Sequence, residues 1–337
     1  DVDGRPHRRA HGADLGHGLV DDLARRELVV GADAALADTA RGIPGPDDVG
    51  LERGVALGHR LARAVGDVGH GAERLRAEIA EEVRQIGDVG LATVLVGDDP
   101  ASDIYVRRKH DAAQEVGIQS IDHRLPADTP QEELERLVGE LNADDAVDGI
   151  LVQSPLPDHL DEEAAVRRLD PSKDVDGFHP ENAARLYMGE PRFVPATPVG
   201  IMRLLQEYEV PLEGARAVVV GRSLIVGKPV SMLLLGANAT VTTTHSRTAD
   251  LGAHTREADL LVVAVGQVDV VTADMVKPGS TVVDVGMNRT DDGLRGDVDP
   301  AAVEIARLLT PVPGGVGPMT IASLLRNTVE AARLRRC

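Results

Sequence analysis

Apolar residues in the stretch from residue 72 onward recur with the period of a helix. Leu75, Ile79, Val83 and Ile86 fall three or four positions apart, which is the spacing of the buried face of an amphipathic helix. A continuous apolar run, Leu91–Val96, follows and ends at a Gly-Asp-Asp-Pro sequence. This order predicts a helix, a buried strand and a turn.

Helical and strand-like patterns continue to alternate toward the middle of the chain. Helical patterns cover Tyr105–Val116 and Gln131–Leu141, and Gly149–Val152 has the pattern of a short buried strand. Because helices alternate with strands, the pattern favours a parallel α/β sheet.

The second half of the chain opens with a helical segment, Val199–Tyr208. Four strand-like segments follow: Ala217–Val220, Thr240–Thr243, Leu260–Val265 and Thr281–Val285. This spacing is typical of a doubly wound, Rossmann-type nucleotide-binding domain. The predicted fold class is therefore α/β with two domains, for which 337 residues are sufficient.

Residues 1–66 differ in composition from the rest of the chain. They contain no aromatic residue and no Lys, Ser, Asn, Gln or Met, and Gly and Pro interrupt their apolar residues before a period develops. We interpret this stretch as an extension that is disordered or is not part of the native protein.

Charge and cysteine content exclude several classes of function. A net charge of −19 opposes nucleic acid and anionic membrane as partners. The single cysteine, Cys337, permits no intrachain disulfide and suggests no metal site. No apolar run reaches the ~18 residues of a membrane span and the start lacks a secretion signal, so we expect a soluble, cytoplasmic protein.

A glycine-bearing turn follows the strand Ala217–Val220, with the sequence Gly221-Arg222-Ser223-Leu224-Ile225-Val226-Gly227-Lys228-Pro229 before a helix that we expect to start at Val230. Such a turn brings backbone N–H groups and a helix N-terminus close to a phosphate. Ser223 takes the place of the middle glycine of the common GxGxxG pattern, and a glycine after a strand is often only a turn.

The end of the next strand indicates which dinucleotide would bind. NAD enzymes usually carry an acidic residue there for the ribose hydroxyls, whereas this chain has Ser246 and Arg247 after Thr244-His245. A hydroxyl and a guanidinium suit a 2′-phosphate, and Arg222 can converge on the same place. The sequence therefore favours NADP over NAD, the alternative being that both arginines are ordinary surface charges.

Four further segments are candidates for chemistry, although each has an ordinary structural interpretation by itself. Tyr105 and Lys109 share a helix face, Gln153 precedes a proline-rich loop, Asp176-Gly177 is a typical turn, and the Gly/Pro run from Pro313 resembles a connector.

Taken together and in order, the motifs YxxxK, VQxPLP, DVDG, GRSxxVGKP, HSxT and PGGVGPMT resemble the bifunctional methylenetetrahydrofolate dehydrogenase/methenyltetrahydrofolate cyclohydrolases. The resemblance runs from about residue 72 to the C-terminus. Ala196, Ser154 and Thr244 depart from the usual residues of the family, but none of these departures removes an expected catalytic group.

The resemblance implies an NADP-dependent enzyme with tetrahydrofolate substrates, acting as a homodimer. It implies that Lys109 is the catalytic amine, that Gln153 positions it, that Asp176 binds the pterin and that Tyr105 lines the folate. It places two sets of residues in binding sites: Gly221, Arg222, Ser223, Gly227, Ser246, Arg247 and Gly266 for NADP, and Pro313, Gly314 and Gly315 for folate, with no metal.

The resemblance also suggests domain boundaries: the extension over 1–66, a catalytic folate-binding domain over 67–198, an NADP-binding domain over 199–315 and a C-terminal helix over 316–337 that returns to the first domain. Three alternatives stay open at this point. They are a dehydrogenase without cyclohydrolase activity, another two-domain NADP dehydrogenase of the shikimate type, and a non-catalytic NADP-binding protein.

The implied chemistry suits these residue types. Hydride transfer from the methylene carbon depends mainly on orientation. Hydrolysis of the resulting methenyl cation needs a base, and a desolvated lysine held by an uncharged glutamine can accept the proton. A carboxylate such as Asp176 can accept two parallel hydrogen bonds from the pterin.

Overall fold

The computed structural model describes residues 70–291 and 293–336, so the predicted extension over residues 1–66 lies outside the described residues. The first described element is a helix over residues 70–86. It leads into β1 (Gly90–Val96), the central strand of a parallel sheet whose order is β2-β1-β3. Strand β2 spans Gln119–Leu125 and β3 spans Gly149–Val152.

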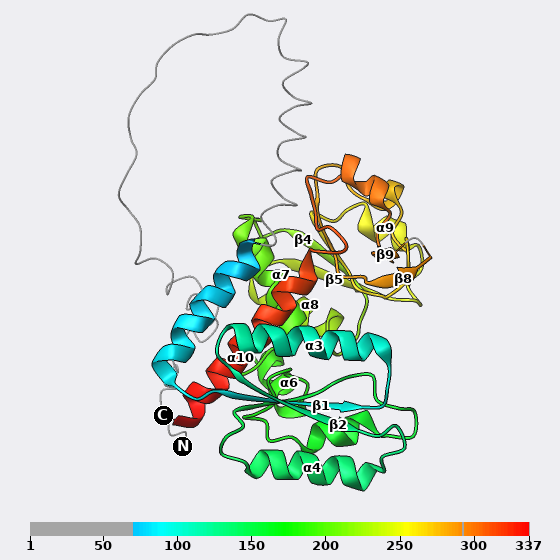
Figure 1. Ribbon diagram of the computed structural model, residues 1–337. Coiled ribbons are helices and arrows are strands. Elements are labelled where there is room, and N and C mark those ends of the chain that lie inside the picture. Colours follow the sequence, from blue (N-terminus) through cyan, green and yellow to red (C-terminus); the bar gives the residue numbers. More distant parts are fainter. Residues whose placement is uncertain (1–69, 292, 337) are drawn as a thin grey trace, which may run out of the picture. The chain divides into compact units, whose positions relative to one another are not determined.

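Helices cover both faces of this first sheet, and in Figure 1 α3 and α4 lie on opposite sides of the strands. Helix α3 spans Pro100–Glu115 and begins where the Asp99 side chain accepts a hydrogen bond from the Ser102 N–H at 2.8 Å. This is a typical N-cap, with proline at the first helical position. Helix α4 (Gln131–Ala143) packs Leu134 and Val138 into a core shared with β1 and β3.

A second parallel sheet has the order β10-β7-β6-β4-β5. Its strands are β4 (Arg216–Val220), β5 (Thr240–Thr244), β6 (Leu260–Val263), β7 (Thr281–Asp284) and β10 (Leu308–Leu309). The chain passes from β4 to β5 on one side and then to β6 on the other, so a topological switch point lies at β4. In such sheets ligands bind at the carboxyl ends of the strands beside that point.

Shorter elements connect the strands of both sheets. They are α5 (Glu162–Arg168), α6 (Pro180–Tyr187), α7 (Ala196–Glu207), α8 (Gly227–Gly236), α9 (Leu251–Thr255), the 3-10 turns η1 (Ala273–Met275) and η2 (Pro300–Glu304), and the antiparallel pair β8 (Asn288–Thr290) and β9 (Gly293–Arg295).

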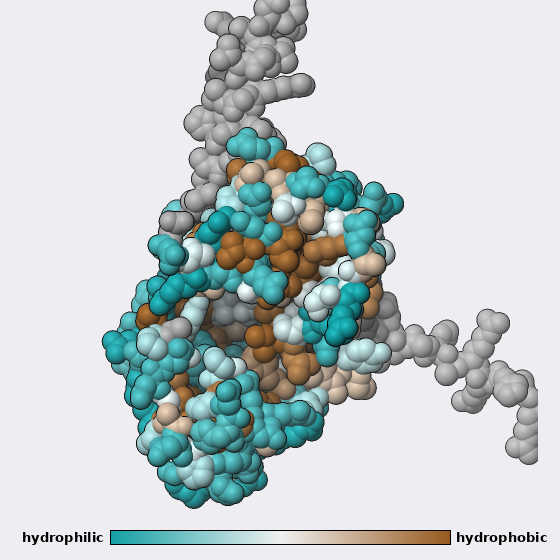
Figure 2. Space-filling view, turned by 90° about the vertical axis from the view of Figure 1, so that its right-hand side faces the viewer, coloured by the Kyte–Doolittle hydropathy of each residue, from teal (hydrophilic) through white to brown (hydrophobic). Residues whose placement is uncertain are grey.

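One described face is largely hydrophilic, and the apolar side chains that remain on it gather around a hollow (Figure 2). Large apolar side chains that stay exposed in the structure include Tyr105, Leu224, Ile225 and Met287.

Among the described residues, no helix combines the length and the apolar character that a membrane crossing requires.

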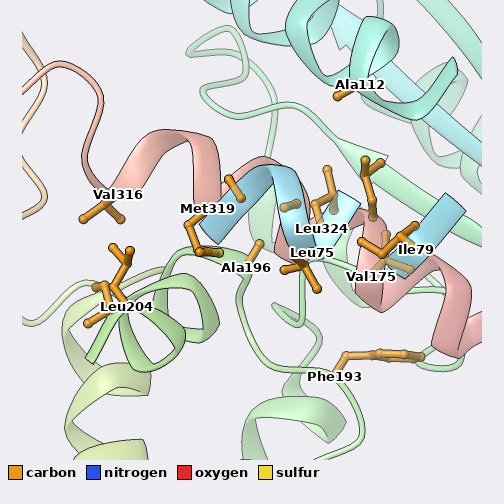
Figure 3. Packing of buried hydrophobic residues seen from close by; sticks show 14 of the residues in the cluster. Leu75, Ile79, Ala112, Val175, Phe193, Ala196, Leu204, Val316, Met319 and Leu324 are labelled. Carbon is orange, nitrogen blue, oxygen red and sulfur yellow. The ribbon is translucent and has the colours of Figure 1, made fainter. Parts of the chain in front are cut away.

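The C-terminal helix α10 (Val316–Arg336) packs along α7 and also contacts α3, β1 and β3. Figure 3 shows Met319 and Leu324 of α10 among Leu75, Ile79 and Ala196, and all five side chains are buried. Asn327 fastens the helix further, because its Nδ2 donates to the carbonyl oxygens of Val175 at 2.8 Å and Val194 at 2.9 Å. These contacts are compatible with the predicted domain division, which stays a prediction.

Most of the longer elements lie where the sequence pattern predicts them, and the differences include a strand that was not predicted and a helix that begins earlier than expected. The hydrophobic pattern did not predict strand β2 (Gln119–Leu125), because it is an edge strand whose polar residues remain partly exposed. Helix α8 begins at Gly227 and not at Val230, since Pro229 lies in the first turn, where a missing N–H costs no helical hydrogen bond.

Candidate active site

Lys109 and Gln153 meet although 44 residues separate them. Lys109 lies on α3, and Gln153 directly follows β3, where its backbone N–H donates to the Val94 carbonyl at 2.8 Å. The Lys109 Nζ donates to Gln153 Oε1 at 3.1 Å, and the Gln153 Nε2 donates to the Ser154 carbonyl at 2.5 Å. Both ends of the Gln153 amide are therefore fixed, and its oxygen faces the amine.

Asp176 completes this cluster through electrostatics. Burial raises the pKa of Asp176 to about 6, while the positive charge of Lys109 acts in the opposite direction and Asp174 adds to the increase. Burial also lowers the pKa of Lys109, an effect that Asp176 partly opposes. The amine is thus easier to deprotonate than that of a solvated lysine, while Asp176 is mainly ionised at neutral pH.

The chain around Asp176 is held tightly. Asp174 forms a parallel bridge with Ile150 of β3, and the Ile150 N–H donates to the Lys173 carbonyl at 2.7 Å. Gly177 has φ = 69°, and a Cβ there would approach the backbone carbon of Val194 to 2.8 Å. A glycine is needed for this turn, which places Asp176 beside β3.

Tyr105 lies one helical turn before Lys109, on the same face of α3. Its ring is exposed, and its hydroxyl contacts the sulfur of Met287, which precedes β8. The segment Pro313–Gly315 lies directly before α10. Pro313 and Gly314 are exposed and Gly315 is buried.

The turn after β4 has the close backbone approach that a phosphate cradle needs. Gly221 has φ = 120°, and a Cβ on it would overlap the carbonyl oxygen of Ala264. A Cβ on Gly227 would overlap the carbonyl oxygen of Gly221. The Ser223 Oγ accepts from the N–H groups of Val226 at 3.1 Å and Gly227 at 3.2 Å, so this serine shapes the start of α8.

Ser246, Arg247 and Arg222 surround this turn. Strands β4 and β5 pair in register up to Val220 and Thr244, so Ser246 and Arg247 leave β5 at the same sheet edge as Gly221. All three side chains are exposed. In the part of the chain that the structure describes, neither guanidinium forms a side-chain hydrogen bond or ion pair, so both cations are available for an anion.

Gly266 belongs to the loop after β6 and has φ = 67°. Its N–H donates to Asp297 Oδ2 at 2.9 Å. The buried carboxylates Asp297 and Asp284 were not singled out by the sequence analysis, and Asp174 entered it only as the first residue of the DVDG motif, without a role. The only sequence signal was an acidic residue near a glycine at the end of a strand, which is a common pattern in turns.

Asp174 lies two residues before Asp176 and has buried hydrogen-bond partners of its own. It accepts hydrogen bonds from the His179 N–H at 2.8 Å and from Asn182 Nδ2 at 2.9 Å, and burial raises its pKa.

Within residues 70–291 and 293–336, no three His, Cys, Asp or Glu side chains are grouped so that they could hold a metal ion.

Two family models match most of the chain. The tetrahydrofolate dehydrogenase/cyclohydrolase catalytic domain matches residues 67–176, and the NAD(P)-binding domain of the same family matches residues 195–336. Similar curated proteins include the bifunctional protein FolD of Burkholderia thailandensis, 55% identical over 77% of this chain and 94% of the relative, and that of Exiguobacterium sibiricum, 54% identical over 78% and 96%.

Solved structures of dehydrogenase/cyclohydrolases are also similar to this chain. The bifunctional FolD dehydrogenase/cyclohydrolase of Campylobacter jejuni is 47% identical, with a TM-score of 0.78 over 80% of this chain and 98% of that chain. The Trypanosoma brucei dehydrogenase-cyclohydrolase, solved with NADP cofactor and inhibitor, is 38% identical, with a TM-score of 0.75 over 81% and 97%.

Proposed function

Because this chain belongs to the tetrahydrofolate dehydrogenase/cyclohydrolase family, we propose that it carries out both reactions of the family name. It oxidises 5,10-methylenetetrahydrofolate to 5,10-methenyltetrahydrofolate with NADP and hydrolyses the product to 10-formyltetrahydrofolate. The observation that carries the second activity is the partly buried Lys109 amine, whose Nζ donates to Gln153 Oε1 at 3.1 Å.

The nucleotide turn suits NADP. The overlap that a Cβ would cause at Gly221 and Gly227 means that glycine is needed for the tight turn after β4, where α8 then offers its N-terminus to a phosphate. Gly266 lines the neighbouring loop, and Arg222, Ser246 and Arg247 supply cations and a hydroxyl for a 2′-phosphate. When bound, NADP supplies a hydride acceptor.

In the hydrolytic step, water attacks the methenyl carbon and Lys109 accepts a proton from it, after which the bond from that carbon to N5 breaks and N5 takes up a proton, leaving the formyl group on N10. Gln153 keeps the amine oriented without adding a charge, so the amine stays weakly basic. Asp176 accepts hydrogen bonds from the pterin amino and ring N–H groups and so holds the substrate for both steps. Tyr105 lines the folate, and Pro313, Gly314 and Gly315 border it.

One assay separates the candidate functions. The protein is incubated with methylenetetrahydrofolate and either NADP or NAD, and NADPH or NADH and 10-formyltetrahydrofolate are measured together. We expect both NADPH and 10-formyltetrahydrofolate. NADPH with accumulation of methenyltetrahydrofolate would indicate a dehydrogenase alone, and binding without turnover would indicate a non-catalytic protein.

We also propose that the chain acts as a cytoplasmic homodimer, which the family resemblance supports. Light scattering should give about twice the chain mass of 35.6 kDa. A mass equal to one chain at micromolar concentration would contradict the dimer.

A further inference from the structure

A fully buried carboxylate that follows β9, Asp297, accepts hydrogen bonds from three consecutive backbone N–H groups. Its Oδ2 accepts from Val265 at 2.6 Å and Gly266 at 2.9 Å, and its Oδ1 accepts from Gln267 at 2.9 Å. A fourth donor, Asn288 Nδ2, reaches Oδ1 at 2.9 Å. Hydrogen bonds of this kind, with a charged acceptor, are stronger than neutral ones.

A second buried carboxylate fixes Asp297 itself. Asp284 lies at the end of β7, and its Oδ1 accepts from the N–H groups of Asp297 and Gly286, both at 2.9 Å. Its Oδ2 accepts from the Val298 N–H at 3.0 Å. Cβ atoms at Gly286 or Gly296 would overlap these carboxylates, so glycines leave the space that the network occupies.

The loop that Asp297 holds lies against the nucleotide turn. It follows β6, and the preceding residue, Ala264, donates its N–H to the Val220 carbonyl at 2.8 Å. The carbonyl oxygen of Ala264 is also the atom that a Cβ on Gly221 would overlap. The loop therefore borders Gly221 at the carboxyl end of β4, the edge at which a dinucleotide binds in this kind of sheet.

Loss of the carboxylate would leave buried N–H groups without an acceptor, and such groups are costly. The loop could relieve that cost only by moving, and its movement would change the space beside Gly221. Lys109 lies on α3 and Gln153 follows β3 of the first sheet, and among the described residues neither side chain makes a hydrogen bond to this network.

We propose that Asp297 is a positioning residue for the dinucleotide, which fixes the loop Val265–Gln267 against the Gly221 turn and thereby sets NADP affinity without serving the hydrolytic step. This inference rests on the proposed function, since it assigns the nucleotide turn to NADP. A residue that served only general stability would affect both activities equally.

The test is Asp297→Asn in the full chain, because an amide keeps one acceptor oxygen and turns an NH₂ group toward N–H donors. Loss of hydrogen bonds to a charged acceptor should raise the Kd and KM for NADP by about 10-fold or more. Hydrolysis of supplied methenyltetrahydrofolate, measured without NADP, should keep the parent rate.

Asp259→Asn is a control for position in the sheet, since Asp259 is exposed whereas Asp297 is fully buried. Asp259 also accepts a backbone hydrogen bond, from the Arg216 N–H at 2.9 Å, but it precedes β6 and so lies at the opposite edge of the sheet. The Kd for NADP should not change in this variant. A similar rise in Kd in the control would overturn the assignment to Asp297.

If circular dichroism shows that Asp297→Asn does not fold, Asn288→Ala tests the proposed role of Asp297 in its place. It removes one donor to Asp297, together with two longer contacts of 3.3 Å to the carbonyl oxygens of Arg295 and Gly296, and should raise the Kd for NADP by about 3-fold. An unchanged Kd in the folded variants, or equal losses of both activities, would overturn the inference. A parent protein that binds NADP but turns over no folate would refute the proposed function instead, while the Kd comparison would still test Asp297.

Discussion

Lys109 is the residue at which the two proposed reactions separate. Hydride transfer depends on the relative position of folate and cofactor, whereas attack of water requires a proton acceptor. Lys109→Met keeps the aliphatic stem and its packing on α3 but removes the basic nitrogen. Since general bases contribute about 10²-fold to 10⁴-fold, 10-formyltetrahydrofolate formation should fall by at least ~100-fold, while NADP reduction stays measurable.

Single-turnover formation of methenyl- and 10-formyltetrahydrofolate measures this separation. Arg108→Met is the control, because Arg108 is the exposed neighbour of Lys109 on α3 and should tolerate the same substitution. Asp176→Ala should impair both steps, since both need the pterin in place. If Lys109→Met formed 10-formyltetrahydrofolate at the parent rate, the proposed hydrolytic mechanism would be wrong.

Arg247 is proposed to distinguish NADP from NAD. It is exposed beside the end of β5 and has no side-chain partner among the described residues, so its guanidinium is free for a 2′-phosphate. A hydrogen bond to a charged group is typically worth about 1.5 to 3 kcal/mol, so Arg247→Ala should weaken NADP by roughly 10-fold to 100-fold. The KM for NAD should hardly change.

Parallel titrations of NADP and NAD check this prediction. Arg167→Ala, which removes an exposed arginine of α5 in the first half of the chain, should alter neither affinity. Equal losses for both cofactors in Arg247→Ala would show that Arg247 holds the pyrophosphate or the fold.

At the scale of elements, periodicity predicts what is buried and fails where exposure is mixed. The helix over residues 70–86 and strand β1 were predicted because most of their large apolar residues, such as Leu75 and Ile79, are core residues. Strand β2 was missed because an edge strand needs no continuous apolar face. The pair β8 and β9 is only three residues per strand, too short to show a period.

Sequence motifs likewise predicted some residues of the candidate site and missed others. Lys109, Gln153 and Asp176 were found from motifs, and the structure joins Lys109 to Gln153 directly. Asp297 could not be found in this way, because its partners are backbone N–H groups of residues 30 or more positions away. Backbone donors have no sequence signature, so only the folded chain shows which carboxylate they meet.

At the scale of the whole molecule, α10 and the helix over residues 70–86 depend on each other. Arg326 Nη1 lies 2.5 Å from Glu82 Oε1, and Arg333 Nη2 lies 2.8 Å from Glu82 Oε2. Leu75 and Ile79 are buried in the same core as Met319 and Leu324 of α10. The first helix is therefore part of the folded core, although it comes directly after the stretch of unusual composition.

Because the helix over residues 70–86 belongs to the core, the chain should tolerate the loss of residues 1–66 but not the loss of this helix. Residues 1–66 carry none of the motifs, and the catalytic-domain model begins at residue 67. Deleting 1–66 should therefore preserve both activities and change the free energy of unfolding by less than about 1 kcal/mol, a shift in Tm below about 4 °C.

Deleting residues 1–86 is the contrasting variant. It also removes the buried side chains Ala72, Leu75, Ile79 and Val83. Because losing one buried Leu or Ile side chain costs about 2–5 kcal/mol, their combined loss would exceed the ~5–15 kcal/mol that holds a typical protein folded. This variant should show no cooperative thermal transition by circular dichroism. If the shorter deletion abolished the transition as well, residues 1–66 would have to contribute to the folded core, and their interpretation as an extension would be wrong.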